Sequence, residues 1–280
     1  MLWLGDNTYL REVDWNSRSG ILHRYTHTRS TKELQALLAN THHYAIWDDH
    51  DYGPNDSDRS YIMKDVAREV FTLFWGNPTY GLDGKHGITT AFTYNDMDFF
   101  LLDNRYFRTP NGMKIGTPTI LGEPQLEWII DALIHSSAPF KMVAVGGQVL
   151  NTATIFENYA LLAPQERSYL LKRIEEEGIT GVIFLSGDRH HTELSSFVNA
   201  QGYEVYDLTV SPLTSGTGTD RDGEHNALRA EGTLVIAHNF GLLNFSGSAE
   251  ERQLNIQIID VEGTEIWNRT IKAVIVDDEH

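Results

Sequence analysis

Residues 44–56 read Tyr-Ala-Ile-Trp-Asp-Asp-His-Asp-Tyr-Gly-Pro-Asn-Asp, an apolar run that stops at four polar side chains, residues 48–51. Three other apolar, strand-like segments also end in acidic, amide or histidine residues: Leu4 precedes residues 5–7, Leu102 precedes residues 103–105 and Leu185 precedes residues 186–191. In α/β sheets, binding sites gather at the carboxyl ends of the strands. We therefore expect the four polar clusters to lie together at one edge of a sheet.

The segments around these clusters alternate between helical and strand-like patterns as far as about residue 190. Helices are expected near residues 61–75, 124–134 and 170–178, and strands near residues 89–94, 97–102, 142–145 and 182–185. The clearest helix begins near Pro124 and carries one apolar stripe that extends to Ile134. Residues 30–33, Ser-Thr-Lys-Glu, have the pattern of a capping box ahead of a further helix.

Strand-like patterns dominate from about Thr192 onward. Strands are expected at residues 194–198, 205–210, 234–237, 254–259 and 266–274. The glycine-rich residues 215–223 indicate a mobile loop between them. This order predicts two β-sheets flanked by helices in one domain, residues 1–280.

Composition excludes several functions. The chain has 280 residues, with 22 basic and 39 acidic side chains and a net charge of -17. This charge argues against stable binding of nucleic acid or of an anionic membrane. Because there is no cysteine, a disulfide framework and a thiolate site are excluded. No apolar run approaches the roughly 20 residues that a membrane span needs.

The polar clusters have the chemistry of a metal site. Carboxylates with a few imidazoles suit divalent or trivalent cations, and two cations about 4 Å apart commonly hold a phosphoryl group and activate a water molecule. Bound cations also provide local positive charge inside an acidic protein. Asp6, at the tip of a strand, is the candidate for a ligand that bridges two ions. His50 is the candidate for protonating the leaving group.

Five blocks occur in the order found in PhoD-like alkaline phosphatases, and the chain resembles this family over about its first three quarters. The blocks are Gly-Asp-Asn-Thr-Tyr at 5–9, Trp-Asp-Asp-His-Asp-Tyr-Gly-Pro-Asn-Asp at 47–56, Leu-Asp-Asn-Arg at 102–105, Gly-Gly-Gln-Val at 146–149 and Ser-Gly-Asp-Arg-His at 186–190. The long second block is specific, whereas an isolated Gly-Asp or Gly-Gln would mean little.

The resemblance implies a fold, a reaction and a set of ligands. The implied fold is the four-layer α/β/β/α sandwich of the metallophosphoesterases, with two mixed β-sheets. The implied reaction is hydrolysis of phosphate monoesters or diesters, which are small-molecule substrates used in phosphate acquisition. The implied metal ligands are Asp6, Tyr9, Asp49, Gln148, Asp188 and His190, where Asp49 replaces an asparagine, and Gln148, Asp188 and His190 stand at histidine positions of the wider superfamily.

The resemblance also implies two or more metal ions. Tyr9 has the spacing of the iron-binding tyrosine of purple acid phosphatases, so iron beside calcium is expected, with manganese and zinc as alternatives. Tyr9 as a packed aromatic and Gln148 as a structural amide are the competing interpretations. Arg105 either clamps the substrate phosphate or pairs with nearby carboxylates.

Three smaller residue interpretations complete the site. Asn55 and Asp56 are expected to support their turn rather than to contact metal. His191 is expected to be a core or supporting histidine, because adjacent strand residues point to opposite faces.

One departure from the family pattern concerns the start of the chain. The family has an earlier strand that supplies the first metal ligand, and nothing precedes Met1 here. We expect a fragment of a longer periplasmic, cell-surface or secreted protein, with a gap in the sheet and weakened metal binding. The rival interpretations are a poorly metallated, non-catalytic remnant or binding domain and, last, a structural calcium site or a pair of glycosidase carboxylates.

Overall fold

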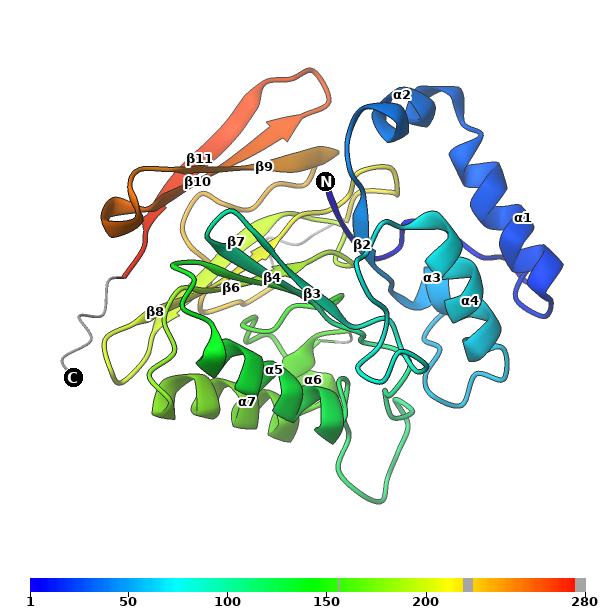
Figure 1. Cartoon of the computed structure of the whole chain (residues 1–280), viewed down its shortest axis with the longest axis horizontal. Helices are drawn as coiled ribbons and strands as arrows, with labels where there is room; N and C mark the ends of the chain where they lie inside the picture. The colour runs from blue at the N-terminus through cyan, green and yellow to red at the C-terminus, as the bar shows by residue number, and fades with distance from the viewer. Residues whose placement is uncertain (156, 219–223, 275–280) are drawn as a thin grey trace.

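A six-stranded mixed sheet runs through the centre of the computed structural model, which describes residues 1–155, 157–218 and 224–274 (Figure 1). Its strands, in spatial order, are β3 (Thr90–Tyr94), β4 (Met97–Leu101), β5 (Lys141–Ala144), β6 (Val182–Ser186), β8 (Glu204–Thr209) and β7 (Glu193–Val198). The four central strands are parallel, and the two edge strands pair antiparallel to them. The carboxyl ends of the central strands therefore meet at one edge.

Helices cover one face of this sheet, below it in Figure 1. They are α5 (Glu123–His135), α6 (Tyr159–Leu162) and α7 (Pro164–Glu176). Both long helices have a proline in the first turn, where no backbone N–H is needed. Leu126, Ile129, Ile130 and Leu133 of α5 are buried against the sheet, whereas Ile134 is 47% exposed. The predicted stripe of α5 thus ends one residue early.

Two smaller sheets lie on the opposite side of the central sheet from α5 and α7. Strands β1 (Leu2–Leu4) and β2 (Tyr44–Ile46) form a parallel pair, and β9 (Asn239–Ser246), β10 (Gln253–Asp260) and β11 (Glu265–Lys272) form an antiparallel sheet. One apolar core joins these strands to the central sheet. Beside β2 in Figure 1 stand α1 (Arg18–Arg29), α2 (Lys32–Asn40), α3 (Asp49–Tyr52) and α4 (Lys64–Phe74).

The mixed α/β class and the layered order are as predicted, but the second group of strands differs in detail. It forms a parallel pair and an antiparallel sheet instead of one mixed sheet. The predicted strand at 234–237 is reduced to a single bridge between Thr192 and Val235. Helix α1 was not predicted, because only Ile21, Arg24 and Tyr25 of its residues are buried and its apolar stripe is thin.

The sequence signals for the start of a helix and for a loop were only partly right. Helix α2 begins at Lys32, and its N-cap residue, Thr31, makes no side-chain capping hydrogen bond, so the predicted capping box is absent there. Residues 219–223 of the predicted glycine-rich loop lie outside the described residues. Within the described ranges, no helix is both long and apolar enough to span a membrane.

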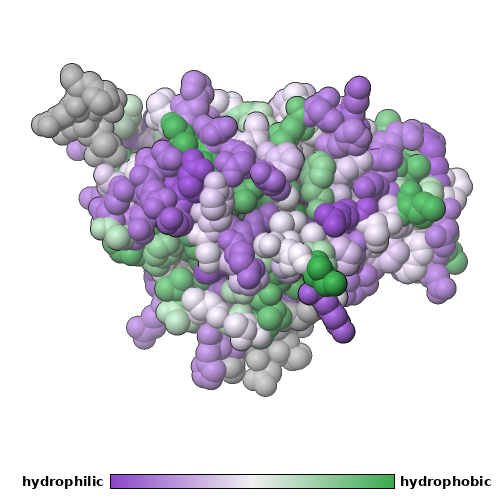
Figure 2. All heavy atoms as spheres, turned by 90° about the horizontal axis from the view of Figure 1, so that it is seen from below, coloured by the Kyte–Doolittle hydropathy of each residue, from purple (hydrophilic) through white to green (hydrophobic). Residues whose placement is uncertain are grey.

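Hydrophilic residues cover most of the face seen in Figure 2, with hydrophobic residues scattered between them. This view is from below Figure 1, the side on which α5 and α7 cover the sheet. Isolated apolar side chains are normal on a surface in contact with water. This face therefore gives no sign of a functional site.

Candidate metal centre

The polar clusters predicted from the four strand ends come together in the structure. Asn104, after β4, donates to Asp48, after β2, with 2.7 Å between Nδ2 and Oδ1. A small cavity of about 10 Å³ is lined by residues from three of the clusters, Asp48, Asn104 and Asp188. The carbonyl oxygen of Leu4 would lie 2.8 Å from a Cβ placed on Gly187, so the ends of β1 and β6 approach closely.

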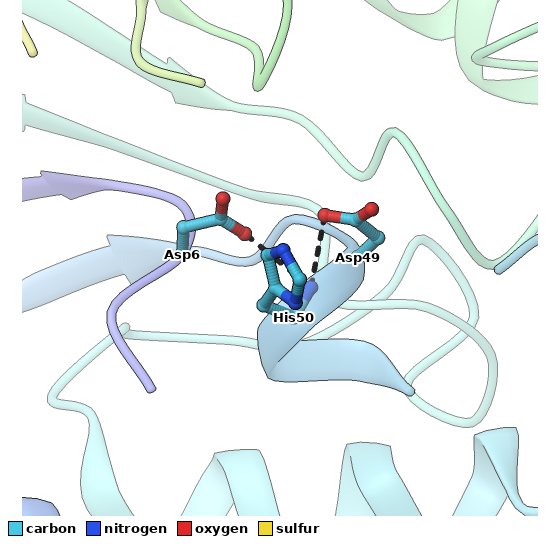
Figure 3. A group of neighbouring side chains, drawn as sticks. All are labelled: Asp6, Asp49 and His50. Atoms are coloured by element: carbon cyan, nitrogen blue, oxygen red, sulfur yellow. Dashed lines mark hydrogen bonds between the residues drawn. The ribbon is translucent and has the colours of Figure 1, made fainter. Parts of the chain in front are cut away.

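Asp6, Asp49 and His50 form the first group of candidate ligands (Figure 3). One ligand atom of each lies within 4.8 Å of the others. Asp6 comes from the loop after β1, and Asp49 and His50 come from the start of α3. The His50 backbone N–H lies 3.3 Å from Asp6 Oδ1 and 2.9 Å from Asp49 Oδ1. Residues 44 positions apart in the chain are thus joined at one point.

Asp51 holds the two parts of this group together. Its buried carboxylate accepts hydrogen bonds from the backbone N–H groups of Thr8 at 2.9 Å and of Asn7 and Asp48 at 3.1 Å. Burial raises the pKa of Asp51 to about 8, although these hydrogen bonds favour the ionised form. Gly5, with φ of 95°, has no room for a side chain, because a Cβ there would lie 2.8 Å from Asp48 Cβ.

Asp49 also belongs to a second group, with Asp56 and Glu157. One carboxylate oxygen of each lies within 4.8 Å of the others, and the Asp56 N–H donates to Asp49 Oδ2 at 2.7 Å. This backbone contact fits the supporting role expected for Asp56, and its carboxylate also lies within reach of a shared ion. Glu157 was missed because the loop that carries it has no recognisable motif.

Backbone strain is concentrated at these residues. Among the residues that the structure describes, six non-glycine residues have a positive φ, and one of them, Asn95, lies in the β3–β4 turn. The other five are Asp6, Asp56, Glu157, Asp188 and His190. Such conformations cost free energy and persist only where the surrounding structure holds them, which is typical of functional sites.

The electrostatics of the cluster favour bound cations. Burial, followed by repulsion from Asp48 and other carboxylates, raises the pKa of Asp6 and Asp188 well above the ordinary value. Burial also raises the pKa of Glu157. By contrast, Arg105 and His50 lower the pKa of Asp49 against the effect of burial. A cation near the first three groups would relieve the cost of their negative charge.

Unpaired oxygens point to the same conclusion. Asn104 Oδ1, Asp56 Oδ1 and Asp188 Oδ2 are buried and have no hydrogen-bond donor within the described ranges. Buried acceptors without a partner are costly, and carboxylate and amide oxygens are ligands for hard cations. The donor set therefore fits metal ions.

Gln148 is bonded within a different network. Its Nε2 donates to Glu193 Oε1 at 2.7 Å and to Thr209 Oγ1 at 2.8 Å, and its Oε1 accepts from Asn151 at 2.8 Å. Both ends of the amide are thus engaged, which favours the structural interpretation of this side chain.

Tyr9 and Arg105 both touch the candidate ligands. The Tyr9 hydroxyl lies 3.4 Å from Asp6 Oδ2, and its ring stacks on His50 at 4.4 Å between centroids. Burial and the Asp6 charge raise the pKa of Tyr9. The Arg105 Nε donates to Asp48 Oδ1, and its Nη2 is 3.8 Å from Asp49 Oδ1. Arg105 therefore pairs with carboxylates, as one of its two interpretations predicts.

His191 is fully buried, as expected, beside two carboxylates outside the main cluster. It lies within reach of Glu193 and Glu224. Arg229 donates to Glu193, and Arg189 Nη2 is 2.8 Å from Glu224 Oε2. Since two arginines already offset these carboxylates, this group is a poor cation site. It instead holds the turn at Arg189, whose carbonyl oxygen lies 2.9 Å from His191 Nδ1 and whose guanidinium pairs with Glu224.

Comparisons with known proteins bear on the family and the fold of the chain. A family model described as PhoD-like phosphatase matches residues 17–256, and none of the curated protein sequences matches the chain. A solved structure of PhoD superposes with a TM-score of 0.73 at 16% identity, covering 99% of this chain and 67% of that one. A purple acid phosphatase, PPD1 from yellow lupin (Lupinus luteus) seeds, superposes with a TM-score of 0.57 at 10% identity, covering 90% of this chain and 43% of that one.

These likenesses confirm the predicted metallophosphoesterase type of fold. The chain spans about two thirds of the length of the PhoD structure and less than half of the lupin enzyme.

Proposed function

Because the chain belongs to the PhoD-like phosphatase family, we propose that it hydrolyses phosphate monoesters, diesters or both with bound metal ions. The observation that carries this proposal is the meeting of Asp6, Asp49 and His50 beside buried oxygens that lack hydrogen-bond donors. Small phosphate esters are the proposed substrates, and a periplasmic, cell-surface or secreted location is proposed from the family.

The proposed metal ligands combine the sequence motifs with the residues found beside them. They are Asp6, Tyr9, Asp49, Gln148, Asp188 and His190, to which the geometry adds Asp56 and Glu157. Bound cations would stabilise charge on the phosphoryl group. They would also lower the pKa of a bound water molecule, and the hydroxide that forms would attack phosphorus. Iron and calcium are the proposed ions, with manganese and zinc as alternatives; Tyr9 beside Asp6 supports iron. Gln148 is the weakest member, because its amide is engaged elsewhere.

His50 and Arg105 are the proposed catalytic side chains. A ring nitrogen of His50 lies within 4.8 Å of carboxylate oxygens of Asp6 and Asp49, beside the proposed metal ligands. From there it can pass a proton to the departing alcohol. Arg105 holds Asp48 and Asp49 in position and lines the cavity, where it can offset charge on the phosphoryl group.

The test is metal content together with hydrolysis of p-nitrophenyl phosphate and bis-p-nitrophenyl phosphate. Asp49→Ala is expected to lose bound metal and to lower kcat/KM at least about 100-fold, because Asp49 belongs to both ligand groups. Asp131→Ala, at an exposed position of α5, is the matched control and should behave as wild type. The ratio of the two substrates would separate a monoesterase from a diesterase.

The same measurement decides the alternative of a poorly metallated, non-catalytic remnant or binding domain. That alternative would replace the proposal if the wild-type chain held no metal after loading and hydrolysed neither ester.

A further inference from the structure

Arg108 is a buried cation that lacks a carboxylate partner. The residue is 4% exposed, and its Nε and Nη2 donate to the neutral Asn111 Oδ1 at 3.3 and 2.9 Å. Within the described part of the chain, no Asp or Glu oxygen comes within 4.0 Å of its guanidinium. A buried charge without a counter-charge is costly unless a ligand supplies one.

The backbone around Arg108 is held rigidly. The buried Asp103 carboxylate accepts from the N–H groups of Arg105 and Tyr106, both at 2.9 Å, and so fixes the turn that follows β4. The Arg108 N–H donates to the Arg105 carbonyl at 3.2 Å, and its own carbonyl accepts from the Arg59 N–H at 3.0 Å. Asn111 then anchors the guanidinium. The side chain is therefore positioned before any ligand arrives, which lowers the entropic cost of binding.

Arg105 and Arg108 line the same cavity but differ in what they can still bind. Arg105 forms an ion pair with Asp48, and its guanidinium also lies near Asp49. Arg108 has only its contact with the neutral asparagine, and its Nη1 makes no hydrogen bond with the described residues. Burial and the charge of Arg105 lower the pKa of Arg108 to about 10, so it stays protonated at neutral pH. Arg108 is thus the more available cation.

The cavity has room for one oxygen atom. Its volume of about 10 Å³ is enough to hold at least one water-sized group. Asp48, Glu157 and Asp188 also line it. Arg105 offsets Asp48, and in the proposed function the other two carboxylates face metal ions. A single phosphoryl oxygen can then enter beside Arg108.

We propose that Arg108 binds one non-bridging oxygen of the substrate phosphoryl group, beside Arg105. This inference rests on the proposed phosphoesterase function and assigns the phosphate contact to a residue that sequence motifs did not single out. A planar guanidinium suits phosphate oxygens, and charge-assisted hydrogen bonds are among the strong ones in proteins.

The experiment is a calorimetric titration of metal-loaded protein with inorganic phosphate, for wild type, Arg108→Gln, Arg108→Lys and Arg18→Gln. Arg108→Gln is expected to raise the Kd for phosphate roughly 10- to 100-fold, with the metal content and Tm of wild type. Arg108→Lys should be intermediate, since it keeps the charge and loses the planar fork. Arg18, which pairs with Glu69 at the surface, is the control and should leave the Kd unchanged.

Kinetics provide a second readout. With p-nitrophenyl phosphate, Arg108→Gln should raise KM more than it lowers kcat if the contact is made in the ground state as well as in the transition state. A merely structural role would instead change Tm or metal content and leave the phosphate affinity of the folded, loaded fraction intact.

The inference is overturned if Arg108→Gln binds metal as wild type does and its Kd for phosphate rises less than about threefold, well below the expected loss of a charged contact. If that variant does not fold, the same criterion applies to Arg108→Lys. Wild type that binds no phosphate would also overturn it. Wild type that binds phosphate but hydrolyses neither ester would refute the phosphoesterase proposal alone, because the titration still measures Arg108.

Discussion

Replacing Asp51 by alanine is expected to loosen both halves of the candidate metal centre at once. This fully buried carboxylate is the acceptor for three backbone N–H groups, of Asn7, Thr8 and Asp48. Two of these residues precede α1, and the third lies at the start of α3. Without the carboxylate, the loop that carries Asp6 loses its attachment to the segment that carries Asp49.

The size of the effect follows from the donors that are left unpaired. Thr8 and Asp48 are 3% and 1% exposed, so water cannot readily replace the lost acceptor. Each buried donor without a partner costs about 1–3 kcal/mol. Part of this cost is offset because burial raises the pKa of Asp51 to about 8, so ionised Asp51 itself carries a desolvation penalty. We expect a net loss of about 3 kcal/mol, or a fall in Tm of roughly 6–12 °C.

The assay is thermal unfolding followed by circular dichroism, with metal content measured on the same samples. Asp131→Ala, an exposed change of the same residue type, should stay within about 0.5 kcal/mol of wild type. Asp51→Asn keeps one acceptor oxygen and should fall between the two. If Asp51→Ala unfolds within about 2 °C of Asp131→Ala and holds the same amount of metal, the anchoring role of Asp51 is refuted.

Three further outcomes test other parts of the structure. Arg24→Met should lower the free energy of unfolding by about 3–5 kcal/mol near neutral pH, because it leaves the buried Asp14 without the counter-charge that now lies 2.7 Å away at Arg24 Nε; urea unfolding would measure this. Arg24 lowers the pKa of Asp14 against the effect of burial, so the stabilisation is present above the unfolded pKa of about 4 and is lost as the pH falls through the lower folded value; a deficit that did not shrink in acid would contradict this. Gln148→Leu should destabilise the fold by about 1–3 kcal/mol yet retain metal if the amide is structural, whereas elemental analysis showing loss of metal in a folded variant would make Gln148 a ligand. A chelator should lower Tm, because burial and then repulsion from neighbouring carboxylates raise the pKa of Asp6 and Asp188 when no cation offsets them; an unchanged Tm after complete metal removal would count against a shared cation site.

Much of the site could be predicted from local sequence, since its residues directly follow apolar strands. Asp6 follows β1, Asp49 and His50 follow β2, and the turn with Asp188 follows β6. The expectation of one common sheet edge was wrong in one respect, because β1 and β2 form a sheet of their own, whereas β4 and β6 belong to the central sheet. Within each sheet, parallel strands place such ends at one edge, and the close approach of β1 to β6 brings the two edges together. Helix α5 could be predicted equally well from the sequence, because helical periodicity and Pro124 are local signals.

Only the tertiary structure decided which side chain bonds to which. Glu157 reaches Asp49 from a position 108 residues later in the chain, through a loop with no motif. The engagement of Gln148 depends on Glu193 and Thr209, and the availability of Arg108 depends on the commitment of Arg105 to Asp48. The spacing of apolar residues along the chain is a local property, so the sequence alone predicts helices and strands from it. The pairing of buried charges depends on distances and burial between remote segments, and these exist only once the chain has folded.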